Sequence, residues 1–483
     1  MLDAIIEERK KKLAKWKNAG YSPYPSTVKR THAIKDVLDS FDDWASRRET
    51  VSIVGRVFAL RDQGKLIFID IRDETGKIQG ILKNDGLSNF SLLQEALDVG
   101  DFVELGGALM LTDRGEKSIA AQSSRIIVKS LRPLPDKYYG LEEVETRLRK
   151  RYLDILINEE VRELFRKKTL FWQTCRDFLV RGGFFEVETP VLEATPGGAD
   201  AEPFTTHHNA LDTDFFLRIS LEIPLKKLLV AGYEKVFEIG RVFRNEGIDR
   251  EHLQEYTQME CYAAYWDHER MMNFVEALYK DVIKKTMNDL CVQHGDKIID
   301  WEKKWPRLDY FELFLKANNI DLRMATDDDL RQKAMELKLE VPAYLGRGRL
   351  IDLIYKKTVR PTLMEPSFLV NHPIEVSPLA KKDPADHHLV LRFQPVALGT
   401  ELGNGWAELN DPIDQRTRFK EQMRLREAGD TEAQRSDEEF LEAMEYGMPP
   451  AAGFGLSERL FSIIVDRPMR ETVIFPPMRR SNR

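Results

Sequence analysis

Residues 237–265 read FEIGRVFRNEGIDREHLQEYTQMECYAAY, and this stretch decides the fold. Apolar and polar residues alternate with a period of two on either side of a polar centre, which predicts two β-strands joined as a hairpin. The first strand is expected to carry Arg244 and Glu246, and the second to carry Glu260 and Tyr262. Because alternate side chains of a strand share a face, the hairpin presents charged groups together and is suited to holding a nucleotide.

The size of the chain predicts two or three domains. It has 483 residues, of which 42% are hydrophobic, so it is too long for one ordinary domain and can form two cores. Its formal net charge of -7 argues against a dedicated nucleic-acid binder. A basic segment, RKKKLAKWK, stands at residues 9–17, on a helical pattern with Ile5, Ile6, Leu13 and Trp16. It predicts a basic amphipathic helix that either packs on the body of the protein or contacts RNA.

Cysteine usage and hydropathy indicate a cytoplasmic protein. The three cysteines, Cys175, Cys261 and Cys291, form no CxxC pair, which argues against structural zinc and against a disulfide framework. No run reaches the roughly 18 apolar residues of a membrane helix. The opening MLDAIIEERKKK lacks the hydrophobic core of a signal peptide. We therefore expect no membrane association and a reducing, cytoplasmic setting.

The first third of the chain predicts a small β-barrel. Residues 1–50 form an amphipathic helix and a helical lead-in, and five short strands separated by Gly, Asp and Asn follow within residues 51–130. Five strands at this spacing suggest a closed barrel, one form of which is the OB type that binds oligonucleotides by stacking bases on aromatic side chains. Residues 131–150, with Pro133 and Pro135, read as a linker.

Residues 151–483 form the second predicted domain. A long helix is expected over residues 158–181, where Gly182 and Gly183 end it. In the strand that follows, Pro190 belongs at an edge or an interface, because proline cannot donate to a central ladder. Residues 289 to about 360 are charged and mostly helical in pattern, which predicts an inserted helical subdomain with no chemistry that we can identify.

One part of the opening stretch and two further stretches resemble a known family. FRNEG at residues 243–247, ELGNGWAELND at 401–411 and PPAAGFGLSERL at 449–460 resemble class II aminoacyl-tRNA synthetases, and lysyl-tRNA synthetases in particular. In that resemblance motif 1 covers about residues 158–192, motif 2 about 236–265 and motif 3 about 449–468, and the match spans nearly the whole chain.

The resemblance implies an α+β protein. It consists of a five-stranded OB-type barrel that binds the anticodon and a catalytic domain with an antiparallel sheet flanked by helices and a helical insertion. It further implies a homodimer formed through motif 1. The implied reaction activates lysine with ATP to lysyl-adenylate and transfers the lysine to the 3′ end of tRNA(Lys).

Such activation depends on placement and charge neutralisation, because the substrate carboxylate attacks the α-phosphorus in line and needs no proton acceptor on the enzyme. By the resemblance, Arg244 and Arg459 are catalytic. Arg244 would form bidentate hydrogen bonds with the α-phosphate, and Arg459 would bind the γ-phosphate. Glu246 would accept from the adenine amino group, Tyr256 would stack on the ring, and His252 would line the ATP pocket.

Magnesium is the cation that the resemblance implies, bound by one or two carboxylates and by phosphate oxygens. Glu401 stands at the family's metal position, but its usual carboxylate partner is Gln394 here, so the number of ions stays open. Motif 3 also departs from the family: GFGLSER is one residue short and ends in Glu458 and Arg459, which could alter the turn that leads into Arg459.

The implied lysine pocket is rich in carboxylates, as a substrate ammonium with three donors requires. Glu260 and Glu408 would reach the side-chain nitrogen, with Tyr262 in support, and Glu222 would hold the α-amino group. Three further positions complete the pocket: Gly198, Asn404 and Trp406. Members of the family commonly have Phe where this chain has Trp406, which would still wall the aliphatic stem.

Four residues match family positions that read the anticodon: Arg61, Phe68, Gln79 and Glu116. Phe68 would stack on a base while the polar residues bond to base edges. Equally, Phe68 could be a barrel core residue and Glu116 a turn residue.

Other functions stay open at this stage. A sister synthetase for aspartate or asparagine would share the motifs, but a carboxylate side chain needs a cation in the pocket, where this chain has Glu260 and Glu408. Protein-modifying paralogues lack the barrel, and lipid-modifying ones carry membrane helices. An inactive or repurposed paralogue that only binds RNA would explain Gln394 and the shortened motif 3.

Overall fold

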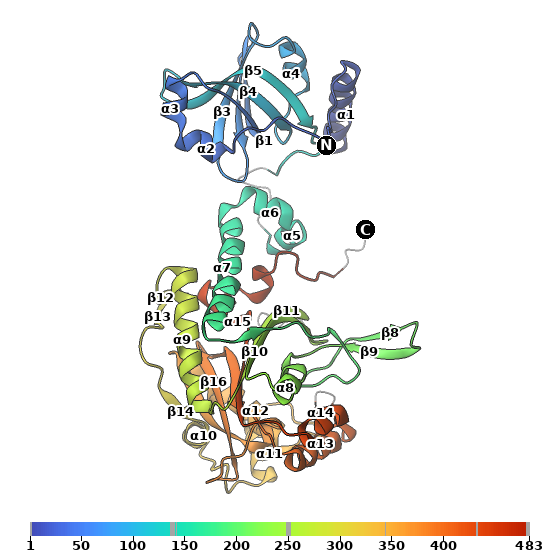
Figure 1. Ribbon diagram of the computed structural model, residues 1–483, viewed down its shortest axis with the longest axis vertical. Coiled ribbons are helices and arrows are strands. Elements are labelled where there is room, and N and C mark those ends of the chain that lie inside the picture. Colours follow the sequence, from blue (N-terminus) through green and yellow to red (C-terminus); the bar gives the residue numbers. More distant parts are fainter. Residues whose placement is uncertain are drawn as a thin grey trace. The chain divides into compact units, whose positions relative to one another are not determined.

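The computed structural model describes residues 2–135, 141, 143–247, 253–342, 344–430 and 433–479. The chain divides between Thr146 and Arg147 into two compact units (Figure 1). No helix of the described residues is long and apolar enough to cross a membrane.

The first unit is built on a closed barrel, which confirms the predicted OB-type fold. Its strands run in the order β1-β2-β3-β5-β4, with β4 closing on β1 and with one parallel pair, β3 and β5. On β2 the alternation places Ile67, Ile69 and Ile71 in the barrel core. The strands are β1 (Thr50–Asp62), β2 (Leu66–Arg72), β3 (Lys77–Lys83), β4 (Phe102–Leu111) and β5 (Lys117–Val128).

Four helices accompany this barrel: α1 (Leu2–Asn18), α2 (Ile34–Asp39), α3 (Phe41–Ser46) and α4 (Phe90–Ala96). The basic segment lies on α1, where Trp16 is fully buried in the barrel cluster. The Arg9 guanidinium donates to the carbonyls of Val99 and Ser130 at 3.0 and 3.1 Å. Lys12 pairs with Asp98 at 2.7 Å. These two cations therefore attach α1 to the barrel, as the packing alternative predicted.

The second unit is built on a sheet of the order β14-β15-β16-β18-β19-β11-β10-β6, with β17 beside β16. Its inner pairs are antiparallel, but the pairs β14–β15 and β6–β10 are parallel, so the sheet is mixed rather than purely antiparallel. Parallel neighbours require a crossover, and helices lie between the members of each pair along the chain. The strands are β6 (Phe185–Glu186), β10 (Lys235–Phe243), β11 (Glu255–Ala264), β14 (Arg307–Asp309), β15 (Ser367–Pro373), β16 (Leu389–Ala397), β17 (Thr400–Glu401), β18 (Gly403–Ala407) and β19 (Ala451–Ser457).

Helices cover both faces of this sheet (Figure 1). Phe237 of β10 packs with α7 and α9, whereas its neighbour Val236 packs with α8 and α14. As predicted, α7 ends at Gly182, and Gly183 takes a φ of 79°. The helices are α5 (Val144–Arg149), α6 (Arg151–Ile157), α7 (Glu159–Arg181), α8 (Glu222–Val230), α9 (His268–Met287), α13 (Pro412–Glu427), α14 (Glu438–Glu445) and α15 (Arg459–Ile464). A smaller sheet consists of β7 (Leu192–Glu193), β8 (Thr205–His208) and β9 (Thr213–Leu217).

The region from 289 to 360 differs from the predicted helical insertion. It begins with a hairpin of β12 (Cys291–His294) and β13 (Lys297–Asp300), and β14 then joins the main sheet. Only α10 (Tyr310–Asn318), α11 (Asp327–Glu336) and α12 (Arg347–Thr358) are helical. Their core includes Leu369 and Val396 of the sheet, so these helices pack on the second unit. The sequence did not predict these strands because each has only three or four residues, too few for a period of two to be recognised.

A buried ion cluster in the barrel unit yields a stability prediction. Lys129 is 2% exposed, and its Nζ lies 2.7 Å from a carboxylate oxygen of Asp101, which is fully buried. Lys129→Met should lower the free energy of barrel opening by about 3–5 kcal/mol, because it leaves a buried carboxylate uncompensated. Amide hydrogen exchange of barrel peptides in the full chain measures this. The exposed Lys83→Met is the control, and unchanged protection in Lys129→Met would contradict the prediction.

Candidate functional site

The second unit contains a cavity of about 700 Å³. Twelve of the residues singled out from the sequence line it: Gly198, Glu222, Arg244, Glu246, Tyr256, Glu260, Tyr262, Gln394, Glu401, Asn404, Trp406 and Arg459. Glu408 does not line it, and His252 lies outside the described residues. Gly198 has a φ of 82°, and a Cβ there would press on Glu222 and Ser220, so the cavity wall requires glycine at this position.

The hairpin delivers Arg244 to the cavity from just beyond a strand. β10 ends at Phe243, so Arg244 and Glu246 lie in the connecting segment and not on the strand as predicted. The polar Asn-Glu-Gly sequence ends the strand, although the amide of Arg244 still donates to the carbonyl of Gln254 at 2.9 Å. The guanidinium carbon lies 5.6 Å from the centre of the Tyr256 ring, a cation–π contact that holds the side chain.

The shortened motif 3 still brings Arg459 to the cavity. α15 begins at Arg459, directly after the fully buried Glu458. The Glu458 carboxylate accepts from Nζ of Lys168 at 2.8 Å and from the amide of Thr257 at 3.1 Å, which ties this turn to α7 and β11. Nη1 of Arg459 donates to the carbonyl of Glu401 at 3.2 Å. A buried ion pair and a backbone hydrogen bond therefore hold the turn that leads into Arg459.

Both arginines affect Tyr256. Burial raises the pKa of its hydroxyl, and the charges of Arg244 and Arg459 act against that rise. The cavity therefore contains two guanidinium groups around one aromatic ring, an arrangement that suits an anionic ligand carrying a flat base.

Three buried carboxylates stand at another part of the site, and a lysine lies among them. Glu222, Glu260 and Glu408 are 2%, 3% and 1% exposed. Nζ of Lys226 on α8 is fully buried, pairs with Glu222, and lies 2.5 Å from Oε2 of Glu408. The sequence reasoning missed Lys226. Its i,i+4 spacing from Glu222 on one helix was the available signal.

Glu260 is held by neutral donors. Its Oε1 accepts from the Ser220 hydroxyl at 2.7 Å, the Leu221 amide at 2.9 Å and the Gln258 amide nitrogen at 2.7 Å. Its Oε2 accepts from the Tyr262 hydroxyl at 2.8 Å. These bonds fix the carboxylate at the cavity wall with no cation of its own.

Glu408 lies behind the wall and keeps one free acceptor. Its Oε2 also accepts from Nε1 of Trp406 at 2.9 Å, a bond that phenylalanine could not make. Among the described residues its Oε1 is buried without a partner. Burial raises the pKa of Glu408 to about 7 and that of Glu222 to about 8, with Lys226 opposing both shifts. Burial alone would lower the pKa of Lys226, but the two carboxylates together raise it.

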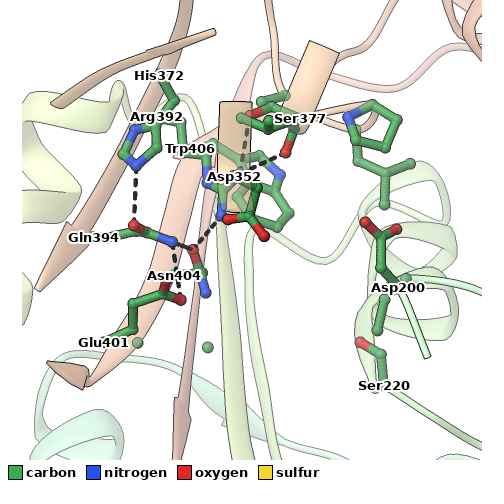
Figure 2. Close-up of a pocket in the computed structure, with 18 of the residues that line it drawn as sticks. Asp200, Ser220, Asp352, His372, Ser377, Arg392, Gln394, Glu401, Asn404 and Trp406 are labelled. Carbon is green, nitrogen blue, oxygen red and sulfur yellow. Dashed lines mark hydrogen bonds between the residues drawn. The ribbon is translucent and has the colours of Figure 1, made fainter. Parts of the chain in front are cut away.

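A hydrogen-bonded network surrounds Gln394 at the metal position (Figure 2). Its amide nitrogen donates to Oε2 of Glu401 at 3.2 Å and to Oδ1 of Asn404 at 2.7 Å. Nη2 of Arg392 donates to the same Asn404 oxygen at 2.6 Å. Burial, with help from Arg392, lowers the pKa of His372 to about 3, so its neutral ring donates from Nε2 to the Gln394 carbonyl oxygen at 3.0 Å.

This edge of the cavity contains few metal ligands. The described residues hold no cluster of three or more His, Cys, Asp or Glu side chains that could bind a metal ion. Glu401 is the carboxylate available, and Gln394 already donates to one of its oxygens. Such an edge suits Mg²⁺ that is bound mainly by water and phosphate, and not by a cage of protein ligands.

Helix α12 contributes residues that the sequence did not reveal. Asp352, Tyr355 and Lys356 line the cavity, and Lys356 pairs with Asp352 at 2.7 Å. His372 and Arg392 were missed as well. None belongs to a recognisable motif, and each reaches the site only through the packing of α12 and of β15 against β16.

The four anticodon candidates lie in the first unit. Arg61 on β1 pairs with Phe68 on β2 in the barrel register. Phe68 is half-buried on the outer face, between the core residues Ile67 and Ile69, so it is not a barrel core residue. Gln79 accepts from the Ser118 hydroxyl at 3.1 Å, and Glu116 is exposed in the β4–β5 connection.

Comparisons with known proteins agree with this architecture. A family model described as tRNA synthetases class II (D, K and N) matches residues 143–479, and one described as an OB-fold nucleic acid binding domain matches residues 51–127. The lysine–tRNA ligase of Roseiflexus castenholzii is 43% identical over 484 residues, which cover 99% of both chains. Those of Moorella thermoacetica and Bacillus subtilis are 41% and 38% identical, each over at least 98% of both chains.

The turn before α15 gives a second prediction. Glu458→Ala should lower the free energy of unfolding of the second unit by about 3–5 kcal/mol, because Lys168 loses its buried partner. Calorimetry of the full chain should show an earlier transition for this unit. Glu442→Ala, at an exposed position of α14, is the control. A Glu458→Ala protein that melts like the control would show that the turn does not depend on the ion pair.

Proposed function

This chain belongs to the class II tRNA synthetases (D, K and N), and from that membership we propose that it is a lysine–tRNA ligase. It activates lysine with ATP to form lysyl-adenylate and transfers the lysine to the 3′ end of tRNA(Lys). The observation that carries the choice of lysine is the cluster of Glu222, Glu260 and Glu408, three buried carboxylates whose one internal counter-ion is Lys226. Buried carboxylates are stable only when cations pair with them, and a substrate with two ammonium groups supplies the two that Lys226 does not.

The other amino acids of this family fit the pocket less well. An aspartate side chain would bring a further negative charge to a site that already has an excess of carboxylates. The cation nearest to these carboxylates, Lys226, is fully buried and engaged by Glu222 and Glu408. Arg392, another cation that lines the cavity, donates to Asn404 and to the carbonyl of Val376. The cavity therefore favours a cationic side chain over an anionic or neutral one.

Activation relies on the two arginines. Arg244 holds the α-phosphate and the substrate carboxylate together, and Arg459 neutralises the phosphate end that leaves as pyrophosphate. Tyr256 stacks on adenine and Glu246 accepts from its amino group. Both residues line the same cavity as the arginines, which supports these roles.

Glu401 would hold Mg²⁺, which when bound supplies positive charge to the phosphates. Gln394, with its neutral amide, orients Glu401 through the hydrogen bond at 3.2 Å. Because Gln394 occupies Oε2 of Glu401, we expect Mg²⁺ to contact the other oxygen of this carboxylate.

Two surfaces support the proposed partners. The outer barrel face with the exposed Arg61 and the half-buried Phe68 receives the anticodon of tRNA(Lys), and the exposed Glu116 contributes from the neighbouring turn. Gln79 is only 7% exposed, so its contact with a base needs the side chain to turn outward. Apolar side chains of motif 1 are exposed to solvent. Phe185 is 56% exposed, and its ring stacks on that of Tyr233 with the ring centroids 5.6 Å apart. These side chains support a homodimer through motif 1.

A cytoplasmic location is supported by three free cysteines.

Gln394 and the shortened motif 3 were the two features that favoured an inactive paralogue, and neither disrupts the cavity. Gln394 is integrated into a network with His372 and Asn404, and Glu458 fixes the shortened turn so that Arg459 lines the cavity. An active enzyme accommodates both departures.

Pyrophosphate exchange tests the proposed function. Lysine with magnesium and ATP should support exchange, whereas aspartate should not. Arg244→Ala should reduce exchange by about 10²–10³-fold, because it removes a donor aimed at developing charge. Arg241→Ala, on an exposed neighbouring arginine of β10, is the matched control. Exchange with aspartate alone would overturn the lysine assignment, and substantial activity in Arg244→Ala would overturn the role of that residue.

The anticodon face has its own test. Phe68→Ala should weaken binding of tRNA(Lys) by about 1–3 kcal/mol, the value of one stacked base, and should leave pyrophosphate exchange unchanged. Filter binding measures the affinity, with Leu111→Ala as a control for an exposed apolar residue at the end of β4. An equal loss in both variants would mean that Phe68 has no specific contact with a base.

A further inference from the structure

Lys226 has no part in the roles assigned so far, yet it is the most deeply buried cation near the pocket. Its side chain is fully buried, one helical turn after Glu222 on α8. From the other side, Oε2 of Glu408 approaches its ammonium to 2.5 Å. The ring of Phe440 on α14 lies 5.8 Å from the ammonium and completes its surroundings. Because Lys226 does not line the cavity, it can affect a bound ligand only through Glu222 and Glu408, the two carboxylates that it pairs with.

The charges of this cluster match the proposed substrate. Glu222, Glu260 and Glu408 carry three negative charges when ionised, and Lys226 compensates one of them. Two negative charges are left for a ligand, and free lysine brings two ammonium groups, while its carboxylate is met by Arg244. Uncompensated buried charge is costly, so a pocket with this charge pattern discriminates against amino acids that have a single ammonium group.

The geometry leaves one acceptor at the cavity wall, on Glu222, and one just behind the wall, on Glu408. Lys226 and Trp406 occupy Oε2 of Glu408, and Oε1 is buried without a partner among the described residues. Glu222 lines the cavity although it pairs with Lys226. The internal lysine thus fixes the orientation of both carboxylates and does not block them.

We propose that Lys226 is a specificity-determining positioning residue, a buried counter-ion that orients Glu222 and Glu408, favours their ionised forms and sets the pocket to accept an amino acid with two ammonium groups. This inference rests on the proposed lysine substrate. Among the described residues, the charged groups that face Lys226 are Glu222 on its own helix and Glu408 after β18. Glu260 and Tyr262 on β11 interact in turn with these two carboxylates.

Lysine binding by calorimetry between pH 6.5 and 9 tests the inference, with ATP binding as a second readout. Lys226→Met removes a positive neighbour, which raises the pKa of the carboxylates, and only the ionised carboxylate binds an ammonium group. We expect affinity for lysine at pH 7 to fall by at least about ten-fold, one unit of carboxylate pKa, and to recover as the pH rises. Affinity for ATP should not change.

Two further variants complete the design. Lys227→Met changes the adjacent, partly exposed lysine, which pairs with Glu439 at 3.5 Å, and should bind lysine as the wild type does. Lys226→Arg keeps the charge and should keep the pH profile of the wild type. If Lys226→Met fails to fold, Lys226→Arg decides the question: a loss of lysine binding at every pH would assign Lys226 a purely structural role.

Other outcomes also separate the possibilities. Wild-type affinity and pH profile in Lys226→Met would overturn the inference, as would an equal loss of lysine and ATP binding at all pH values. A wild-type protein that binds ATP but not lysine would instead overturn the proposed function, whatever the variants do.

Discussion

The need to pair every buried charge governs this protein. The second unit buries Glu222, Glu408 and Lys226 together, and the pairing depends on α8, which must lie against β11 and β18 at the right height. That position is set by the apolar cluster between α8, α14 and the sheet. Hydrophobic packing therefore determines where α8 lies, and α8 positions the Lys226 ammonium group. That ammonium group orients Glu222 at the cavity wall and Glu408 behind it.

Much of the fold was predictable because it rests on local patterns. The barrel strands alternate strictly, and the α7 helix ends at two glycines, so periodicity and turn chemistry sufficed. The parallel edge strands were not predictable, since β14 covers only Arg307–Asp309 and gains its place by pairing with β15, sixty residues away. The sequence also did not predict that β10 ends before Arg244. The end of a strand depends on which backbone groups form interstrand hydrogen bonds, and the sequence pattern does not show these.

The site divides in the same way. Residues inside motifs, such as Glu260, Asn404 and Arg459, line the cavity as the resemblance implied. Residues that reach the cavity only through tertiary packing were invisible, among them Asp352 on α12 and Arg392 on β16. Glu408 shows the limit of a motif match: the match identified the residue, but only the structure reveals that Lys226 and Trp406 occupy one of its two oxygens.

The two departures from the family pattern follow from the same constraint. A second carboxylate at position 394 would repel Glu401 unless a cation lay between them. An amide donates to Glu401 instead, and it uses its remaining groups on Asn404 and His372, so this edge is satisfied by the protein itself. In the shortened motif 3, the buried Glu458 pairs with Lys168 and so anchors the turn that leads into Arg459. In both places a hydrogen-bonded side chain compensates for the change, and the guanidinium groups that the proposed reaction requires stay in the cavity.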